Sequence, residues 1–271
     1  MRRGAVGLLL LLSACSTTTA PSTTRNGQWI WSEADAVRLE ESAATHPSVG
    51  AGVWVASITY DTVAHAPRLM LALPPRTARR DSIAAVIRFE SSFDPAWAGG
   101  DDAQLTAQLD TTLRALRTIL ESQAIGVQEL QLDYDVPVRL LPRWAAVLRT
   151  LTSGALAGHE VWVTSLVAHL RERRYGSLLR GAVAGHIVQL FDTGEAADAA
   201  AILELEHLLE RTRLPFRFGV GAFERQRPSG ARTEHRRWFA LVPRLQRHPN
   251  WRGLWIFAGG APWTSLVGRL P

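Results

Sequence analysis

Short β-rich segments alternate with longer amphipathic segments along nearly the whole chain after residue 27, and this alternation limits the folds open to it. Eight segments are rich in β-branched and aromatic residues, as strands are. In most of the stretches between them, apolar residues recur every three or four positions, as in helices packed on one side. The strand segments are centred near residues 29, 54, 86, 130, 162, 188, 218 and 255. This pattern predicts a parallel sheet with helical crossovers.

The number of strands and the length of the chain favour one architecture. At 271 residues, the chain is close to the roughly 250 residues that are typical of a (β/α)8 barrel. We therefore predict an α/β fold, a (β/α)8 TIM-type barrel, that forms a single domain over residues 28–271. An open doubly wound sheet is the alternative, although no glycine-rich turn follows the first strand. One of the two extended runs at residues 52–60 and 68–73 is predicted to be an extra strand or hairpin.

The first 15 residues resemble the signal peptide and lipobox of bacterial lipoproteins. The chain begins Met-Arg-Arg, residues 5–12 are apolar but too few to span a bilayer, and Leu-Ser-Ala-Cys follows at 12–15. Cys15 is the only cysteine in the chain. The resemblance implies cleavage before Cys15, lipidation of its thiol, and an exported protein anchored to the membrane.

The next residues extend this interpretation. If the organism has two membranes, Ser16, rather than Asp, after the cysteine indicates an outer-membrane lipoprotein that faces the periplasm. Residues 16–27 are rich in Ser, Thr and Pro and lack an apolar period, so they are predicted to form a flexible tether before the domain.

The charge of the chain gives no indication of a nucleic-acid partner. The sequence contains no lysine, so its 30 basic residues are all arginine, and the net charge is +5. The arginines are scattered, without a long basic run or a stripe of basic and aromatic residues. We expect a solvated, mildly basic surface and no binding to nucleic acid.

One predicted strand, residues 125–135, ends in two carboxylates. Apolar and polar residues alternate there, which is the period of a strand with two different faces. Asp133 and Asp135 therefore point to the same side, roughly 6–7 Å apart along the strand. Two acids this close raise the pKa of at least one of them, so that one can keep a proton. The alternative is that they bind arginines or cap the next helix.

The ends of the other predicted strands supply more polar and aromatic side chains. In a (β/α)8 barrel the active site lies at the carboxyl ends of the strands. The residues at these ends are Trp31, Glu90, Asp133, Asp135, Ser165, Gln189, Asp192, Glu224 and Trp255. Indole rings stack on sugar rings, and carboxylates transfer protons to glycosidic oxygens, so this set favours a glycan as the ligand.

The acidic strand resembles the fourth strand of family 18 glycoside hydrolases, the chitinase-like barrels. Their motif is Asp-x-x-Asp-x-Asp-x-Glu, and this chain has Gln128, Gln131, Asp133 and Asp135 at the four positions. The resemblance implies that Asp135 is the general acid and Asp133 its partner. Gln replaces both earlier aspartates, and Asp replaces the catalytic Glu, which shortens the reach of the acid by about 1.5 Å where proton transfer needs hydrogen-bond contact.

The mature chain also resembles an uncharacterised group of bacterial lipoproteins, the DUF3142 family. The lipobox, the Gln-Leu-Asp-Tyr-Asp sequence at 131–135 and the Trp-Val-Thr-Ser-Leu sequence at 162–166 carry this resemblance. That family has no known function, so the resemblance supports the barrel and says little about activity.

These observations lead to one leading hypothesis and two alternatives. The leading hypothesis is an exported lipoprotein that resembles a glycoside hydrolase and acts on an extracytoplasmic glycan. The alternatives are a non-catalytic carbohydrate-binding protein and an envelope scaffold that meets a protein partner, so whether the chain is an enzyme stays open. The predicted catalytic residues are Asp135, Asp133 and Glu90. The predicted substrate-binding residues are Trp31, Gln131, Tyr134, Gln189, Asp192 and Trp255.

No metal or cofactor is expected at this site. His159-Glu160 does not begin a His-Glu-x-x-His zinc motif, because Val163 stands where the second His would be. The paired aspartates leave open a metal site for nucleotide-sugar transfer, but an exported protein rarely meets nucleotide sugars.

The lipobox makes the first testable prediction. Replacement Cys15→Ala removes the thiol that would carry the lipid, so membrane association is expected to be lost. Fractionation of cells that produce either form, followed by immunoblotting, measures this. Equal membrane retention of the two forms would contradict the lipoprotein prediction.

Overall fold

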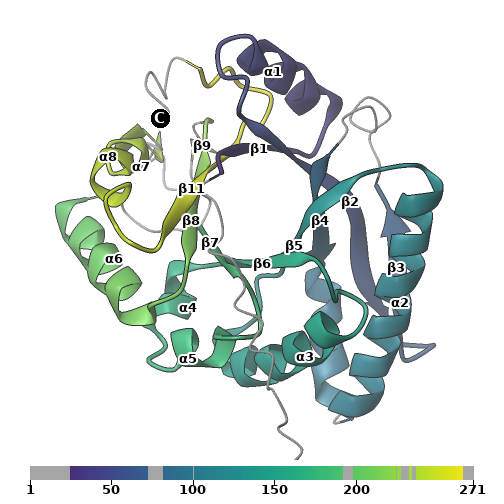
Figure 1. Ribbon diagram of the computed structural model, residues 1–271. Helices are drawn as coiled ribbons and strands as arrows, with labels where there is room; N and C mark the ends of the chain where they lie inside the picture. Colours follow the sequence, from purple (N-terminus) through teal and green to yellow (C-terminus); the bar gives the residue numbers. More distant parts are fainter. Residues whose placement is uncertain are drawn as a thin grey trace, which may run out of the picture.

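Eight parallel strands close into a barrel in the computed structural model, which describes residues 25–72, 82–99, 101–191, 198–223, 225–226, 232–233 and 236–264. The barrel strands are β1 (Gly27–Ile30), β2 (Gly50–Asp61), β4 (Ile83–Phe89), β5 (Val127–Asp133), β6 (Glu160–Ser165), β7 (Gly185–Gln189), β8 (Phe216–Gly221) and β11 (Trp251–Phe257). Each pairs in parallel with its neighbours, and β1 pairs with both β11 and β2, which closes the ring (Figure 1). The predicted (β/α)8 barrel and its single domain are confirmed.

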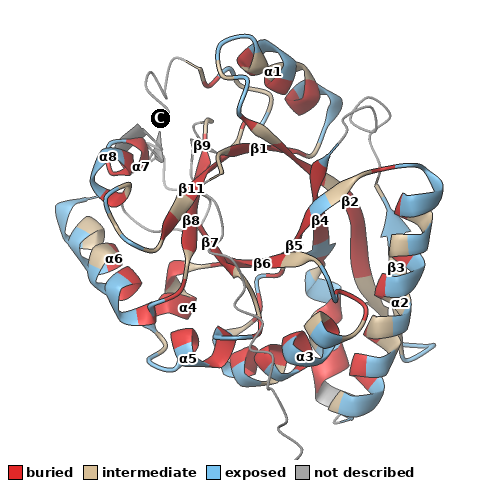
Figure 2. Cartoon of the chain, viewed as in Figure 1, coloured by how far each residue is buried: buried red, intermediate tan, exposed pale blue. Residues whose placement is uncertain are grey.

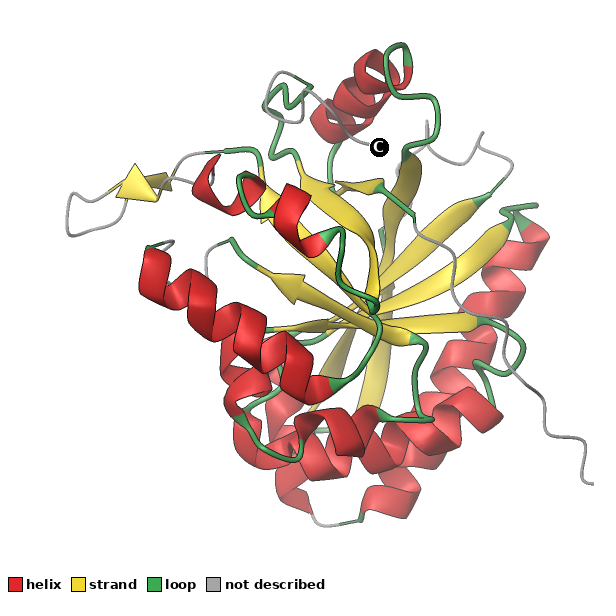
Figure 3. Ribbon diagram, turned by 60° about the vertical axis from the view of Figure 1, so that its left-hand side comes forward, coloured by secondary structure: helices red, strands yellow, loops and turns green. Residues whose placement is uncertain are grey.

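Helices surround the strands on the outside of the barrel (Figure 3). They are α1 (Glu33–Ala43), α2 (Asp102–Ser122), α3 (Leu141–Ser153), α4 (Val167–Arg171), α5 (Tyr175–Leu179), α6 (Ala199–Thr212), α7 (Arg236–Phe239) and α8 (Val242–Leu245), with 3-10 helices η2 (Ser91–Gly99) and η3 (Val138–Leu140). Within the described part of the chain, no helix has the length and apolar character needed to cross a bilayer.

Small departures from the barrel plan follow from local sequence. β3 (Ala66–Leu71) pairs antiparallel with β2 outside the ring and is the predicted extra hairpin. The helical segment before β11 is split into α7 and α8, and Pro243 lies in the first turn of α8, because proline is tolerated there and not in a helix interior. A further short pair, β9 (Arg225–Gln226) and β10 (Arg232–Thr233), lies beyond β8.

The inside of the barrel is filled by tryptophans that pack against glycines. Trp29 and Trp255 lie side by side there with ring centroids 5.8 Å apart. A Cβ atom on Gly52 would come within 2.3 Å of the Trp255 ring, and one on Gly219 within 2.6 Å of Trp29. Tryptophans on some strands therefore face glycines on others, and this leaves room for the indole rings at the centre of the barrel. The inner and outer faces of the strands are both buried (Figure 2).

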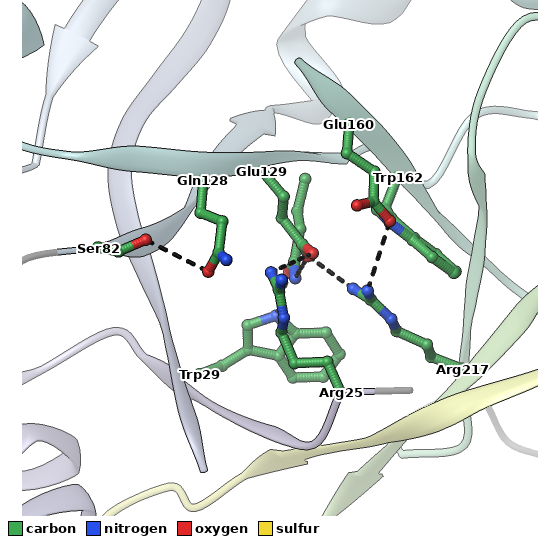
Figure 4. A network of polar contacts seen from close by, with 9 residues as sticks. Arg25, Trp29, Ser82, Gln128, Glu129, Glu160, Trp162 and Arg217 are labelled. Atoms are coloured by element: carbon green, nitrogen blue, oxygen red, sulfur yellow. Dashed lines mark hydrogen bonds and ion pairs between the residues drawn. The ribbon is translucent and has the colours of Figure 1, made fainter. Parts of the chain in front are cut away.

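A network of charged groups closes the amino-terminal end of the barrel (Figure 4). Glu129 is fully buried and accepts hydrogen bonds from Arg217 at 2.6 Å and Arg25 at 3.1 Å. The Arg217 guanidinium also lies 3.6 Å from the centre of the Trp162 ring. Burial lowers the pKa of Arg217, and the charge of Glu129 opposes that shift. The ion pair thus holds β5 and β8 together across the barrel.

Gln131 continues the network upward, toward the carboxyl ends of the strands. Its amide nitrogen donates to Glu129 at 2.7 Å, and its oxygen accepts from the indole of Trp29 at 2.7 Å. Only a side chain that both donates and accepts satisfies these two neighbours. An aspartate at this position, as in the family 18 motif, would place a second anion against Glu129. The network therefore gives a structural reason for glutamine at this position.

The buried ion pair generates a stability prediction. Glu129→Ala leaves Arg217 buried without its counter-charge, which is expected to lower the free energy of unfolding by about 3–5 kcal/mol. Denaturant unfolding of the purified chain measures it. Gln128→Ala is the control on the same strand, because Gln128 is exposed and bonds only the exposed Ser82 among the described residues, so its effect is expected to stay within about 0.5 kcal/mol. Equal effects of the two changes would contradict this account of the network.

Candidate active site

A cavity of about 470 Å³ opens at the carboxyl ends of the barrel strands. Five of its lining residues are charged: Arg88, Glu90, Asp94, Asp133 and Asp135. The others are Trp29, Trp31, Val86, Phe89, Ser91, Tyr134, Thr164, Leu166, Gln189, Phe191 and Phe257. The site therefore combines carboxylates with aromatic walls, at the end of the barrel where such folds carry their active sites.

Most of the predicted site residues meet in this cavity. The three predicted catalytic acids, Asp133, Asp135 and Glu90, all line it, although they come from two different strand ends. Trp31, Tyr134 and Gln189 line it as well. Asp192 and Cys15 lie outside the described residues, so their predicted roles stay predictions.

Two predicted substrate contacts are placed elsewhere. Gln131 and Trp255 are each 0% exposed and do not line the cavity. Gln131 is occupied by Glu129 and Trp29, as described above. Trp255 packs beneath Trp29 and against the bare backbone of Gly52. Both residues support the cavity from below, and the prediction that they touch a ligand is corrected accordingly.

Tyr134 reaches the cavity from the opposite face of β5. Its ring is buried among Phe89, Phe93 and Trp144. Its hydroxyl donates to Asp94 at 2.7 Å and accepts from the indole of Trp97 at 2.9 Å. Burial raises the pKa of this phenol well above its ordinary value. Tyr134 therefore fixes the loop that carries Asp135 and stays protonated.

Several cavity residues were not predicted, and the period of the strands could have identified three of them. Side chains two positions apart share a strand face. Trp29 precedes Trp31 by two, Arg88 precedes Glu90 by two, and Phe257 follows the inward-facing Trp255 by two. Phe191 and Asp94 lie in segments after their strands, where no period applies.

Asp133 is held by two side chains and has a raised pKa. Gln189 donates to its Oδ1 atom at 3.0 Å, and the hydroxyl of Thr164 also bonds the carboxylate. Burial and the negative charge of Asp135 raise its pKa to about 6, against the opposing effects of Thr164, Arg88 and Gln189. The carboxyl group is therefore partly protonated just below neutral pH.

Asp135 follows two residues later in the loop after β5 and is more exposed than Asp133. The protein around it partly desolvates the carboxylate and raises its pKa, while the nearby charge of Arg88 lowers it. Two coupled acids with raised pKa values share protons, so the pair titrates as a unit. Asp133 is fixed by its hydrogen bonds, and Asp135 is open to a ligand.

Glu90 is bound to its neighbours. It accepts from the hydroxyl of Ser57 at 2.9 Å and pairs with Arg88 at 3.3 Å. Ser57 faces the barrel interior because β2 has a register irregularity between Trp54 and Ala56, which reverses the side-chain alternation. Glu90 thus faces the cavity as part of an ion pair.

Trp31 forms one wall of the cavity through stacked rings. It stacks on Trp54 with centroids 5.1 Å apart, and the Arg88 guanidinium lies 5.4 Å from its ring centre. Asp35 accepts from the backbone N–H of Trp31 at 3.1 Å and of Gly260 at 2.9 Å. These bonds tie the ends of β1 and β11 together, so the aromatic wall is fixed before any ligand arrives.

Comparison with solved structures finds the same fold in chitinases and in a spore cortex-lytic enzyme. A chitinase from Chromobacterium violaceum superposes with a TM-score of 0.64 at 13% identity, over 91% of this chain and 98% of that chain. A spore cortex-lytic enzyme from Bacillus megaterium gives 0.62 at 10% identity, over 93% and 75%. A chitinase from Ipomoea carnea gives 0.56 at 11% identity, over 90% and 98%. At these identities, the likeness shows the barrel fold alone.

The sequence has no match of its own among known families. No family profile matches the chain, and no curated protein is similar to it. The DUF3142 resemblance therefore stays a prediction, as does the lipobox. Among the described residues, no group of three or more His, Cys, Asp or Glu is arranged to hold a metal ion.

The raised pKa of Asp133 predicts how stability depends on pH. The pKa of Asp133 is about 6 in the folded protein, above the ordinary value of 3.8. The contribution of this carboxyl group to the stability of the fold is therefore complete below about pH 4 and is lost as the pH rises through 6. The free energy of unfolding of Asp133→Asn, relative to the wild type, should therefore rise by up to about 3 kcal/mol between pH 4 and pH 7. Denaturant unfolding at several pH values measures it.

Asp110→Asn provides a control of the opposite sign. Arg114 and the backbone N–H of Ala155 lower the pKa of Asp110, so its contribution is present at neutral pH and is lost in acid. Its variant should lose stability relative to the wild type as the pH rises. The same pH trend for both variants would refute the assignment of the raised pKa to Asp133.

Proposed function

We propose that this protein is an exported lipoprotein that binds an extracytoplasmic glycan in the cavity and hydrolyses it. The observation that supports this most directly is the meeting of Asp133, Asp135 and Glu90 in one cavity whose wall includes Trp31. Aromatic rings offer the flat apolar surface on which a sugar ring stacks, and glycosidic bonds are broken between paired carboxyl groups. The shared fold with chitinases is consistent with this proposal.

In this proposal the two aspartates have different tasks. Asp135, exposed at the cavity, donates a proton to the glycosidic oxygen as its bond to the anomeric carbon breaks; a water then bonds to that carbon and returns a proton to Asp135. Asp133, oriented by Gln189, is its partner: it positions the substrate, and it holds a proton more readily once Asp135 is anionic, because the charge of Asp135 raises its pKa. Since the pKa of Asp133 is about 6, the pair carries the required proton at mildly acidic pH. Hydrolysis should therefore decline as the pH rises above about 6.

The charge of the cavity narrows the class of glycan. Its described lining has four carboxylates, Glu90, Asp94, Asp133 and Asp135, against the single cation Arg88, which already pairs with Glu90. An anionic sugar would be repelled by the remaining acids. Neutral sugars and sugars with a free amine are therefore the better substrates, and uronic acid polymers the poorer ones.

The alternative is a carbohydrate-binding protein on the same barrel that does not catalyse. The short side chain of Asp135 supports it, because an aspartate reaches about 1.5 Å less far than a glutamate and proton transfer needs hydrogen-bond contact. The contacts of Glu90 support it too, because one carboxylate oxygen already accepts from Ser57 and the other pairs with Arg88. Binding without turnover is its signature.

Hydrolysis and binding assays on three oligosaccharide series test the proposal. The series are neutral N-acetylated, amine-bearing and uronic acid oligomers, each measured with the wild type, Asp135→Asn and Trp31→Ala. Asp135→Asn should lower kcat by at least 100-fold with little change in binding, because it removes the proton donor. Trp31→Ala should weaken binding about tenfold, because it removes the stacking surface.

Asp110→Asn is the control for a loss of carboxylate away from the cavity. Its hydrolysis rate should match that of the wild type. Unchanged turnover in Asp135→Asn would remove Asp135 as the acid. Binding with no turnover in any form would favour the non-catalytic alternative. The absence of both binding and turnover would favour a scaffold with a protein partner.

A further inference from the structure

A second hollow of about 470 Å³ lies on the outside of the barrel, and four of its nine lining residues are arginine. It lies between α5, the end of α6, the segment before α5 and the loops that follow the two helices. Its lining is Arg173, Gly176, Ser177, Arg180, His207, Glu210, Arg211, Thr212 and Arg213. We call the surface around its four arginines the basic face. It has no part in the cavity described above, which is lined by other residues.

The basic face belongs to the amino-terminal end of the barrel, opposite the cavity. Arg180 lies in the loop that leads into β7, and Arg213 in the loop that leads into β8. In a parallel barrel, the loops that lead into the strands all lie at the same end, and the cavity lies at the other. The cavity and the basic face therefore point in opposite directions.

The positive charge of the basic face is not neutralised. Arg173, Arg180 and Arg213 are exposed and form no ion pair with any acid among the described residues. Arg211 donates to the backbone carbonyls of Leu170 at 2.6 Å and Arg171 at 3.1 Å, which satisfies its hydrogen bonds but leaves its charge. Glu210 is the single acid in the lining. The lining thus holds four arginines and one carboxylate, and three of the arginines are exposed.

The chain also enters the barrel at this end. Arg25, the first described residue, donates its N–H to the carbonyl of Arg252 at 2.8 Å, next to the start of β11. Arg25 follows Cys15 by ten positions. A chain of that length spans at most about 35 Å. A lipid on Cys15 would hold the amino-terminal end of the barrel within that distance of the membrane.

We propose that the basic face docks on an anionic membrane surface and turns the cavity away from the bilayer. Guanidinium groups bind phosphate through planar pairs of hydrogen bonds, and anionic headgroups present phosphates as a continuous sheet. Each arginine brought to such a surface raises the partition coefficient about fivefold. The docking surface does not depend on the proposed hydrolysis, although its place near a membrane rests on the predicted anchor.

Vesicle binding by the full chain tests the proposal. The variant Arg173→Gln/Arg180→Gln/Arg213→Gln removes three exposed charges, and Arg68→Gln/Arg114→Gln/Arg139→Gln removes three exposed charges from β3, α2 and η3. Both keep the natural N-terminus, so its own membrane affinity is the same in every protein compared. Co-flotation with phosphatidylcholine vesicles, with and without 30% phosphatidylglycerol, gives the partition coefficients.

We expect the basic-face variant to bind the anionic vesicles about 100-fold more weakly than the wild type and the control variant. All three should bind neutral vesicles equally, and the difference should shrink as salt rises. Equal loss in both variants would show that net charge alone is responsible, and would overturn the proposal. The proposal would also be overturned if the protein bound nucleic acid through the basic face and showed no preference for anionic vesicles. Turnover of a soluble oligosaccharide, measured in parallel, reports on the proposed hydrolysis separately.

Discussion

The ion pair between Glu129 and Arg217 is the interaction on which the interior of this barrel depends. A fully buried carboxylate must be paired, and this one receives Arg217, Arg25 and Gln131. Because side chains on a strand face repeat every two residues, fixing Glu129 at the amino-terminal end of β5 also fixes Gln131 in the middle and Asp133 at the cavity. The position of Asp133, the partner of the candidate acid, is therefore set by a charge at the far end of the same strand.

The depth of the cavity follows from the packing above that ion pair. Trp29 and Trp255 occupy the barrel centre because Gly52 and Gly219 leave room for their rings. The indole of Trp29 is held by Gln131, so its upper edge becomes the floor of the cavity. A ligand can therefore reach Asp133 and go no deeper. This explains why Trp255, which looks like a sugar platform from its place near a strand end, is a buried support.

The sequence predicts the fold better than the site, for a physical reason. Alternation and strand count depend on patterns of many residues, so the eight strands near residues 29 to 255 appear where they were predicted. The meeting of Glu90 with Asp133 also follows from barrel order, because their strands are neighbours. By contrast, the burial of Gln131 depends in part on Trp29, about one hundred residues away, and no local pattern reveals such a contact. The same holds for the register irregularity in β2 that aims Ser57 at Glu90.

Arg88 interacts with three of the acids of the cavity and affects the protonation of two of them. Its guanidinium pairs with Glu90, lies against Trp31, and lowers the pKa of both aspartates. A ligand that displaces water from the cavity strengthens each of these interactions, because charges act more strongly in a less polar medium. The charge of Arg88 would then lower the pKa of the acid that must hold a proton, while the loss of water would raise that pKa. Whether Asp135 donates a proton in a bound complex therefore depends on whether a sugar ring keeps Arg88 against Glu90, and this makes the Arg88–Glu90 pair part of the acid's chemistry.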